Sequence, residues 1–372
     1  MTGIYVHIPF CKSRCIYCGF VSSTLGEAWQ LSYMDALGKE MERRKDENGS
    51  TRARTIYIGG GTPSQLSPQA FEKLIELLCQ NFQIDKDVEF TIEVNPDDIT
   101  PAYVKMLRQS PVNRVSLGVQ SLNDDILHHL HRRHTARQAL KAIELLQEEG
   151  YQNISGDLIY GLPGQSVPMF QDDVKEILRT HIPHLSAYAL QYEEGTPLWE
   201  MRQRGQTKEA DEELSLTCYH RLIDLAVEAG MEHYEISNFA CPGFRSRHNS
   251  SYWKGLPYLG LGAGAHSYDG NNTRKANTSD IKAYIAGGLE TETEILTRNE
   301  LYDERVMLSL RTCEGLSLED VERDFGTAMR RHCEQQAEPH ILRGNIKRTG
   351  ENLCLTRSGL FISDGIITDL LA

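Results

Sequence analysis

The chain has 372 residues, of which 40% are hydrophobic and 24% are charged, and its formal net charge is −13. This composition is typical of a soluble globular protein, and the acidic balance argues against a general attraction to nucleic acid or an anionic membrane surface. The N-terminus lacks a signal-peptide pattern, and no apolar stretch is long enough to span a bilayer. We therefore expect a cytoplasmic protein whose nine cysteines stay reduced.

In chain order, short β-branched or aromatic runs alternate with longer amphipathic runs. The amphipathic runs begin at recognisable caps, which are Ser67 before Pro68, Thr100 before Pro101, and Thr135. Six or seven β-α units in a row predict an α/β fold with a parallel sheet, closed or partly closed into a barrel. The predicted strands are 4–8, 55–59, 88–94, 114–119, 153–161, 184–190 and 232–236.

The β-α alternation ends near residue 236, so we assign 1–236 to the barrel domain. Residues 238–270 fit neither the strand nor the helix period, and a polar segment follows, so 237–299 is expected to connect two domains. From Leu301 the pattern predicts two or three helices and a short strand pair, a small winged-helix-like α+β domain over 300–372. Residues 301–372 hold 12 Asp or Glu against 9 Lys or Arg, so the basic footprint of a DNA-binding module is missing.

Three cysteines, Cys11, Cys15 and Cys18, follow the first predicted strand with the spacing C-x3-C-x2-C. A structural zinc site takes four ligands, usually in two pairs, and no second pair follows here. His7 could complete such a set, but it belongs to the preceding strand. Three thiolates can instead hold three irons of a [4Fe–4S] cluster and leave the fourth iron open to a small chelating ligand. The spacing favours a cluster, with a structural zinc protein as the alternative that iron and sulfide analysis would exclude.

Polar or glycine residues mark the ends of four successive predicted strands. The run GGGTP at 59–63 follows the second strand, where glycine lets a backbone approach a ligand closely. Glu93 ends the third strand, Gln120 follows the fourth, and Asp157 lies in the fifth. Functional groups of a parallel β-α barrel collect at the C-terminal strand ends. These residues therefore predict a polar cleft that suits a zwitterionic, ribose-bearing ligand.

Five motifs span nearly the whole chain: YVHIPFCKSRCIYC (5–18), GGGTPS (59–64), SLGVQSLND (116–124), DLIYGLPGQS (157–166) and HNSSYW (248–253). Together they resemble the radical S-adenosylmethionine (SAM) proteins related to oxygen-independent coproporphyrinogen III oxidase, and most of all their haem-chaperone branch. The resemblance implies a partial TIM-type barrel of six β-α units. It also implies that the three cysteines ligate the cluster and that its open iron takes the amino and carboxylate groups of SAM.

The same resemblance assigns the SAM contacts. It places Tyr5 on the strand beneath the site, Tyr17 near the adenine, and Gly60, Gly61 and Thr62 at the methionine amino group. Around the methionine and ribose it places Glu93, Gln120, Arg132 and Asp157. In such proteins an electron from the reduced cluster cleaves SAM to methionine and a 5′-deoxyadenosyl radical. Whether this chain cleaves SAM or only binds it stays open.

Two departures favour the chaperone branch over porphyrinogen decarboxylation. The oxidases carry a further cysteine where Phe20 stands, and they carry an N-terminal extension for which a first strand at Ile4 leaves no room. The run H-N-x-x-Y-W is the chaperone branch's signature and implies His248 as a haem ligand, near Arg245 and Arg247 for the propionates. The alternative is a loop histidine that only hydrogen-bonds its neighbours. Whether His248 is the sole ligand also stays open, because His233 and His266 flank the same region.

The resemblance further implies delivery of haem to haem-accepting proteins, respiratory ones among them, by a monomer or a cluster-dependent dimer. The alternative is a SAM-radical decarboxylase or another tetrapyrrole-modifying enzyme.

Two further runs have simpler explanations than a ligand site. HHLHRRHT (128–135) is expected to be a polar helix end, because Arg132 matches a SAM contact and Thr135 caps the next helix. GLGAGAH (260–266) does not match the dinucleotide fingerprint G-x-G-x-x-G. Its glycines are expected to pack closely against the barrel.

Overall fold

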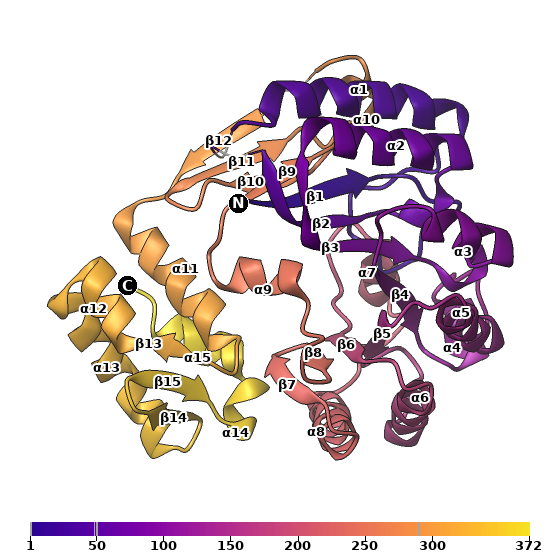
Figure 1. Cartoon of the computed structure of the whole chain (residues 1–372). Coiled ribbons are helices and arrows are strands. Elements are labelled where there is room, and N and C mark those ends of the chain that lie inside the picture. Colours follow the sequence, from indigo (N-terminus) through magenta and orange to yellow (C-terminus); the bar gives the residue numbers. More distant parts are fainter. Residues whose placement is uncertain (1, 48, 50, 289–290) are drawn as a thin grey trace.

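The structure is a computed structural model that describes residues 2–47, 49, 51–288 and 291–372. At its centre, six parallel strands lie side by side in sequence order, which confirms the predicted α/β class with a partial barrel (Figure 1). Both faces of such a sheet are covered, so its strands read as nearly continuous apolar runs. The strands are β1 (Thr2–Ile8), β2 (Arg52–Gly60), β3 (Gln83–Val94), β4 (Arg114–Gln120), β5 (Asn153–Tyr160) and β6 (His184–Ala189).

Helices connect these strands and cover the outer face of the sheet (Figure 1). The predicted caps are present, because the side chains of Ser67, Thr100 and Thr135 each accept a hydrogen bond from a backbone N–H in the first helical turn. The helices are α1 (Ala28–Arg44), α2 (Pro68–Asn81), α3 (Pro101–Arg108), α4 (Asp124–His129), α5 (Ala136–Glu148), α6 (Val167–Arg179), α7 (Pro197–Gln203) and α8 (Glu212–Glu228), with 3-10 turns η1 (Pro63–Gln65) and η2 (Pro96–Asp98).

The chain reverses direction after α8. The segment predicted as a seventh strand forms β7 (Glu232–Glu235), which pairs antiparallel with β8 (Asn238–Ala240), and β8 pairs antiparallel with β6. The parallel part of the sheet therefore has six strands and not seven. Only Ile236 and Ser237 separate β7 from β8, and a connection this short allows a hairpin but no parallel crossover.

The expected connecting region, 237–299, contributes further strands to the same sheet. β9 (Tyr258–Leu261) pairs parallel with β1, and β10 (His266–Tyr268), β11 (Thr273–Asn277) and β12 (Thr291–Ile295) continue from it antiparallel. The region also holds α9 (Arg247–Trp253) and α10 (Ile281–Ile285). The twelve-stranded sheet stays open, with β12 at one edge and β7 at the other, and α9 lies between its two ends (Figure 1).

Close packing explains the glycines of the GLGAGAH run, as expected. A Cβ on Gly260 would lie 1.9 Å from the carbonyl oxygen of His266, so no side chain fits there. Gly262 has a φ of +99°, a conformation that residues with a side chain rarely adopt. The run thus allows β9 and the turn to β10 to lie directly against each other.

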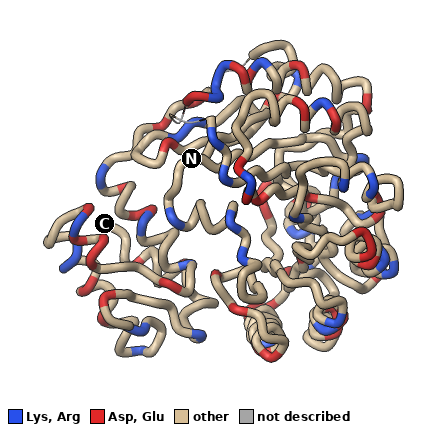
Figure 2. The backbone as a smooth tube through the Cα atoms, in the orientation of Figure 1, with Lys and Arg blue, Asp and Glu red and all other residues tan. Residues whose placement is uncertain are grey.

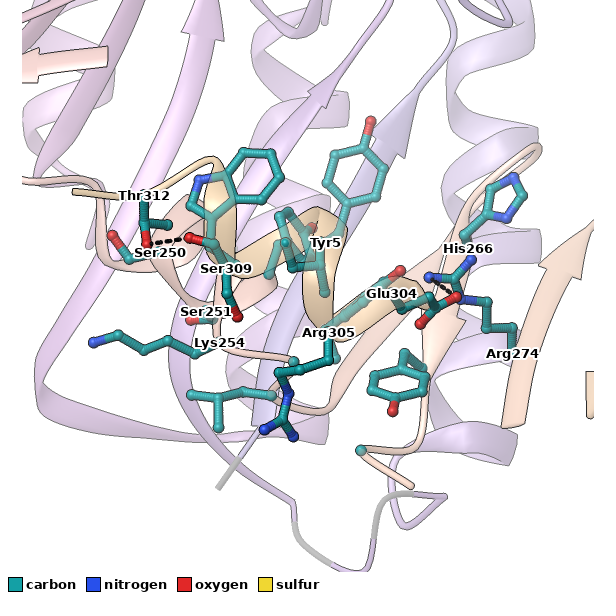
Figure 3. Close-up of a pocket in the computed structure, with 18 of the residues that line it drawn as sticks. Tyr5, Ser250, Ser251, Lys254, His266, Arg274, Glu304, Arg305, Ser309 and Thr312 are labelled. Atoms are coloured by element: carbon teal, nitrogen blue, oxygen red, sulfur yellow. Dashed lines mark hydrogen bonds and ion pairs between the residues drawn. The ribbon is translucent and has the colours of Figure 1, made fainter. Parts of the chain in front are cut away.

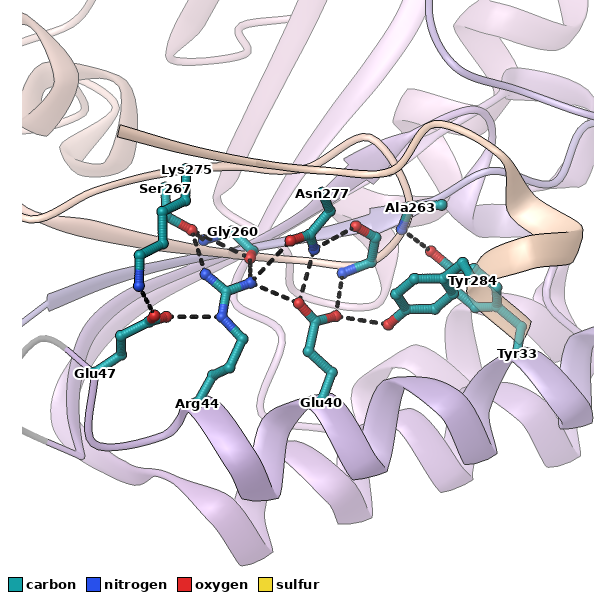
Figure 4. Close-up of polar contacts among 11 residues, drawn as sticks. Tyr33, Glu40, Arg44, Glu47, Gly260, Ala263, Ser267, Lys275, Asn277 and Tyr284 are labelled. Atoms are coloured by element: carbon teal, nitrogen blue, oxygen red, sulfur yellow. Dashed lines mark hydrogen bonds and ion pairs between the residues drawn. The ribbon is translucent and has the colours of Figure 1, made fainter. Parts of the chain in front are cut away.

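A buried polar network joins α1 to these added strands (Figure 4). The Glu40 carboxylate accepts hydrogen bonds from the Gly262 backbone N–H (2.8 Å), the Asn277 amide (2.7 Å) and the Tyr284 hydroxyl (2.6 Å). The Arg44 guanidinium pairs with Glu40 at 2.6 Å, and both side chains are buried. The three donors lie 222 to 244 residues after Glu40, so the network ties distant segments of the chain together.

The C-terminal segment forms a second domain with its own hydrophobic core and a three-stranded antiparallel sheet. It meets the barrel at β7, where the Ile236 N–H donates to the Arg311 carbonyl (3.0 Å) and the Cys313 N–H to the Tyr234 carbonyl (3.0 Å). Acidic and basic residues are interspersed over both domains (Figure 2). No helix in the described part of the chain is long and apolar enough to cross a membrane. The elements are α11 (Arg298–Leu310), β13 (Leu316–Ser317), α12 (Leu318–Phe325), α13 (Thr327–Leu342), β14 (Ile346–Thr349), β15 (Asn352–Leu355), α14 (Arg357–Leu360) and α15 (Ser363–Asp369).

Candidate cluster and cofactor site

The three predicted cluster ligands lie on the loop between β1 and α1. The Thr62 hydroxyl donates a hydrogen bond to Cys11 Sγ at 3.3 Å, and Arg132 Nη1 donates to Cys15 Sγ at 3.4 Å. Burial raises the pKa of the Cys11 and Cys18 thiols. The nearby Arg14 guanidinium favours the thiolate forms of these two residues, and the Arg132 guanidinium is placed against the Cys15 sulfur.

The donor set fits a [4Fe–4S] cluster held by three cysteines. All three are free thiols, partly exposed to one pocket. The backbone of Gly61 passes so close that a Cβ there would lie 2.9 Å from Cys11 Sγ, so glycine keeps the space beside that sulfur open. Within the described residues, no three His, Cys, Asp or Glu side chains already surround one point as metal ligands. The ligand assignment stays a prediction from the spacing.

The cysteine loop forms one wall of a pocket of about 670 Å³ at the C-terminal ends of the parallel strands. Strand ends and the loops after them converge there because all six strands point the same way. Of the predicted cluster and SAM residues, the pocket brings together all except Tyr5. Its lining includes Cys11, Cys15, Tyr17, Cys18, Gly60, Gly61, Thr62, Glu93, Gln120, Arg132 and Asp157.

Two carboxylates face this pocket from inside the barrel. Glu93 accepts hydrogen bonds from the Tyr57 hydroxyl (2.8 Å) and the Gly60 N–H (3.2 Å), and Asp157 accepts one from the Ser116 hydroxyl (3.0 Å). Burial raises the pKa of Glu93 to about 7, with a further contribution from the nearby charge of Asp157, whose own pKa burial also raises. A cationic ligand would favour the ionised forms of both groups.

The opposite charge is supplied by Arg132, whose Nη2 donates to the Gly118 carbonyl at 2.6 Å and contacts the Asn95 side chain. Beside it, Gln120 has a φ of 66°, a left-handed conformation that is uncommon for residues other than glycine and recurs at functional sites. The pocket therefore offers guanidinium groups, Arg132 among them, together with the carboxylates of Glu93 and Asp157. This combination suits a ligand that carries both charges, as an amino acid does.

Sequence reasoning missed several charged residues of this pocket, and Arg114 is the most deeply buried of the described ones. Arg114 opens β4, is 1% exposed, and its Nε and Nη1 atoms have no hydrogen-bond partner among the residues that the structure describes. It lies close enough to Glu93 and Asp157 to favour their ionised forms. An arginine at the head of the apolar run RVSLGV is the signal that could have identified it, because buried arginine is rare without an anionic partner.

Tyr5, His248 and the predicted propionate partners Arg245 and Arg247 lie outside this pocket. Both arginines line a second cavity, where Arg245 is already paired with Glu232 (2.9 Å) and Glu314 (2.7 Å). Tyr5 approaches the strand-end pocket only through Tyr57, with ring centroids 6.2 Å apart, and lines the second cavity instead. His248 is 1% exposed, with Nδ1 2.9 Å from the Thr55 hydroxyl and Nε2 2.8 Å from the Tyr252 hydroxyl. Burial lowers the pKa of His248 to about 3. As a haem ligand it would have to give up one of these hydrogen bonds, so that role stays a prediction.

The second cavity lies between the barrel and the C-terminal domain and has a volume of about 1460 Å³ (Figure 3). β1 contributes Tyr5, β10 contributes His266, and α11 contributes Glu304 and Arg305. Aromatic and basic side chains dominate much of its wall, including Tyr252, Trp253, Tyr258, Tyr268, Phe325, Arg54, Arg245, Arg247, Lys254, Arg274 and Arg298. Gly19 and Phe20, at the end of the cysteine loop, line both cavities.

In comparisons with known proteins, two regions of the chain match two different family models. Residues 5–177 match the family model of the radical SAM superfamily, and residues 296–362 match that of the HemN C-terminal domain. Among solved structures, the chain is similar to coproporphyrinogen III oxidase (HemN) from Escherichia coli, a radical SAM enzyme, with a TM-score of 0.86. That match covers 100% of this chain and 90% of the other at 23% sequence identity, so it shows the fold.

Curated relatives resemble the chain over most of its length. The heme chaperone HemW of Lactococcus lactis is 33% identical over 370 residues, which are 99% of this chain and 96% of that protein. The heme chaperone HemW of Bacillus subtilis is 34% identical over 335 residues, 88% of each chain. The chain therefore belongs to the radical SAM superfamily and, within it, to the HemW family.

Proposed function

We propose that the protein is a cytoplasmic haem chaperone, which binds haem and delivers it to haem-requiring acceptor proteins, respiratory proteins among them. Membership of the radical SAM superfamily implies a [4Fe–4S] cluster and SAM. The observation that carries the proposal is the pair of neighbouring cavities that share the end of the cysteine loop. One suits the cluster and SAM, and the other has the size and lining for a tetrapyrrole.

In this proposal Cys11, Cys15 and Cys18 hold the cluster, and SAM occupies the strand-end pocket. Arg132 meets the carboxylate of SAM, and Glu93 meets its cationic half, because these side chains carry the matching charges. The bound cluster and SAM together supply a route to one-electron chemistry. The chain's own contribution is to orient SAM between opposite charges and to limit the access of water to the pocket.

The second cavity supports haem as the cargo. Its volume exceeds the roughly 300–1,000 Å³ that is usual for small-molecule sites, so it has room for a ligand as large as a tetrapyrrole. Tyrosine and tryptophan rings offer apolar faces to a porphyrin, and basic side chains suit its propionates. The exposed Phe20, with 68% of its surface accessible, adds an apolar group where the two cavities meet.

The alternative of a coproporphyrinogen decarboxylase is not favoured. The curated relatives at 33–34% identity carry the name heme chaperone, whereas the likeness to the oxidase rests on the fold. Phe20 also stands where the oxidases carry a further cysteine. We propose a monomer or a cluster-dependent dimer, with the exposed end of the cysteine loop as the segment that a cluster would order.

The test is an anaerobic titration of cluster-reconstituted protein with haemin, followed by Soret absorbance. We expect saturable binding near one haemin per chain, and transfer of that haem to a haem-free respiratory acceptor protein. Coproporphyrinogen turnover, measured in parallel under reducing conditions with SAM, serves as the control for the alternative. Turnover without saturable haemin binding would overturn the proposal, and so would the absence of both.

A further inference from the structure

Few side chains of the second cavity can ligate a haem iron. Proteins bind haem iron through histidine, cysteine, methionine or tyrosine. Among the described residues that line this cavity, the candidates are two histidines and five tyrosines, namely His7, His266, Tyr5, Tyr234, Tyr252, Tyr258 and Tyr268. The choice of ligand can therefore be made from their hydrogen bonds and their access to the cavity.

The tyrosines and His7 are poorly suited. A tyrosine binds ferric iron as the phenolate, and burial raises the pKa of all five phenols, which disfavours that form. His7 is buried, and both of its ring nitrogens have partners, with Nε2 2.7 Å from the Val21 carbonyl and Nδ1 3.0 Å from the Tyr5 hydroxyl. Neither nitrogen of His7 has a lone pair directed freely into the cavity.

His266 differs in each of these respects. It is exposed, and no hydrogen bond of its ring nitrogens occurs among the described residues. Figure 3 shows it beside Arg274 on the wall of the cavity. Its backbone is held in place by two contacts. Gly260 packs against the His266 carbonyl, and the carbonyl of the preceding residue, Ala265, accepts a hydrogen bond from the Asn277 N–H at 2.9 Å. A free imidazole on a fixed strand is the arrangement that axial ligation requires.

The same cavity has cations available for the propionates. Arg54, Lys254 and Arg298 line it and make no ion pair with any carboxylate in the described part of the chain. Arg274 and Arg305 are already paired, with Glu304 at 2.7 Å and with Asp324 at 3.1 Å. The unpaired cations can meet carboxylates of a ligand without breaking an existing ion pair.

We propose that His266 is an axial ligand of the haem iron in this cavity, and that Lys254 and Arg298 pair with the propionates; this inference rests on the proposed function. A ring nitrogen of His266 donates its lone pair to the iron and displaces a bound water, with no change in the oxidation state. His248 then has a positioning role, since its Nε2 lies 2.8 Å from the hydroxyl of the cavity residue Tyr252.

The experiment compares haemin binding to the full-length parent protein, His266→Gly and His129→Gly. His129 is an exposed histidine on α4 that lines neither cavity. We expect His266→Gly to weaken haemin binding by roughly 100-fold, at least as much as the loss of an outer-shell partner costs a metal site. The electron paramagnetic resonance signal of the bound ferric haem should also differ from that of the parent in this variant, because the iron loses its nitrogen ligand. Added imidazole should restore the parent's signal, which a purely structural defect would not allow.

Each outcome has a distinct meaning. If the parent binds haemin saturably and His266→Gly matches it in affinity and spectrum, His266 is not the ligand, while the haem-chaperone proposal stands. If the parent itself shows no saturable binding, the proposed function falls and this inference with it. If the affinity drops but imidazole leaves the spectrum unchanged, His266 acts through structure and its ligation is refuted. His129→Gly should behave as the parent does, because its ring lies outside the cavity.

Discussion

The network around Glu40 predicts that one substitution far from both cavities will loosen the added strands. In Glu40→Ala, the Gly262 N–H and the Tyr284 hydroxyl lose their acceptor, and the buried Arg44 guanidinium loses its 2.6 Å partner but keeps its ion pair with Glu47 at 2.7 Å (Figure 4). Removing one partner of a buried ion pair typically destabilises a protein by about 3–5 kcal/mol, because the other charge stays buried. Each orphaned donor costs about 1–3 kcal/mol, but these contributions overlap with that of the pair.

Because Arg44 keeps its ion pair with Glu47, we expect Glu40→Ala to lower the free energy of unfolding by about 3 kcal/mol, the lower end of this range. Native-state hydrogen exchange is the assay, because it reports the opening of each segment separately. Amides of β9 to β11 should exchange faster, while amides of the separate C-terminal sheet should keep their protection, since the network links α1 only to the former. Glu40→Gln, which retains a carbonyl oxygen, should fall between the parent and Glu40→Ala.

A matched control is Glu144→Ala, which removes an exposed ion pair with Lys141 at 2.7 Å on α5. It should leave the exchange pattern unchanged, because surface pairs contribute little. If Glu40→Ala lowers the free energy of unfolding by less than about 1 kcal/mol, the stabilising role of the Glu40 network is refuted. Water or rearranged side chains would then replace the carboxylate at little cost. If amide exchange became equally faster in both domains, the stabilising effect of the network would not be confined to α1 and the strands β9 to β11.

Three further predictions concern the site. Cys15→Ala should abolish the cluster and leave the barrel folded, which iron and sulfide analysis beside far-ultraviolet circular dichroism would check; near-normal iron content would contradict the ligand assignment. SAM should bind the parent more tightly as the pH rises through about 7, where Glu93 ionises, and calorimetry should find this dependence absent in Glu93→Gln. Acid should destabilise the fold through His248, because its pKa is about 3 in the folded state and about 6.5 in the unfolded chain. As the pH falls below about 6.5, only the unfolded state binds a proton at this residue, which favours unfolding. Uptake of that proton lowers the free energy of unfolding by roughly 1.4 kcal/mol per pH unit between about pH 6 and pH 3. Denaturation at pH 7, 6 and 5 should therefore show that the free energy of unfolding of His248→Gln depends less steeply on pH than that of the parent, by about one proton.

Much of the barrel could be predicted because its signals are local. A β-branched run buried on both faces, or a Ser-Pro or Thr-Pro cap before an amphipathic run, needs only a few neighbouring residues to identify it. The six parallel strands and the caps at Ser67, Thr100 and Thr135 are of this kind. The direction of β7 was missed, because its pairing depends on a two-residue connection to β8, which carries no periodic signal of its own.

The strands β9 to β12 were missed for a related reason. They are three to five residues long, too short for a clear alternation, and β9 joins the sheet by pairing with β1, which lies more than 200 residues earlier in the chain. The enclosure of His248 likewise depends on Thr55 and Glu89, which lie 193 and 159 residues before it. A motif shows that a histidine is present but not which way its ring faces.

The sequence by itself determined the chemistry that short spacings carry: three thiols in one loop, glycines after the second strand, and carboxylates at successive strand ends. Parallel strands must bring these groups to one edge, so their meeting in a single pocket follows from the order of the elements. Only the tertiary structure decided that Tyr5 faces the second cavity, that His248 is enclosed and that His266 is free. Those outcomes depend on contacts between segments far apart in the chain, which no local pattern encodes.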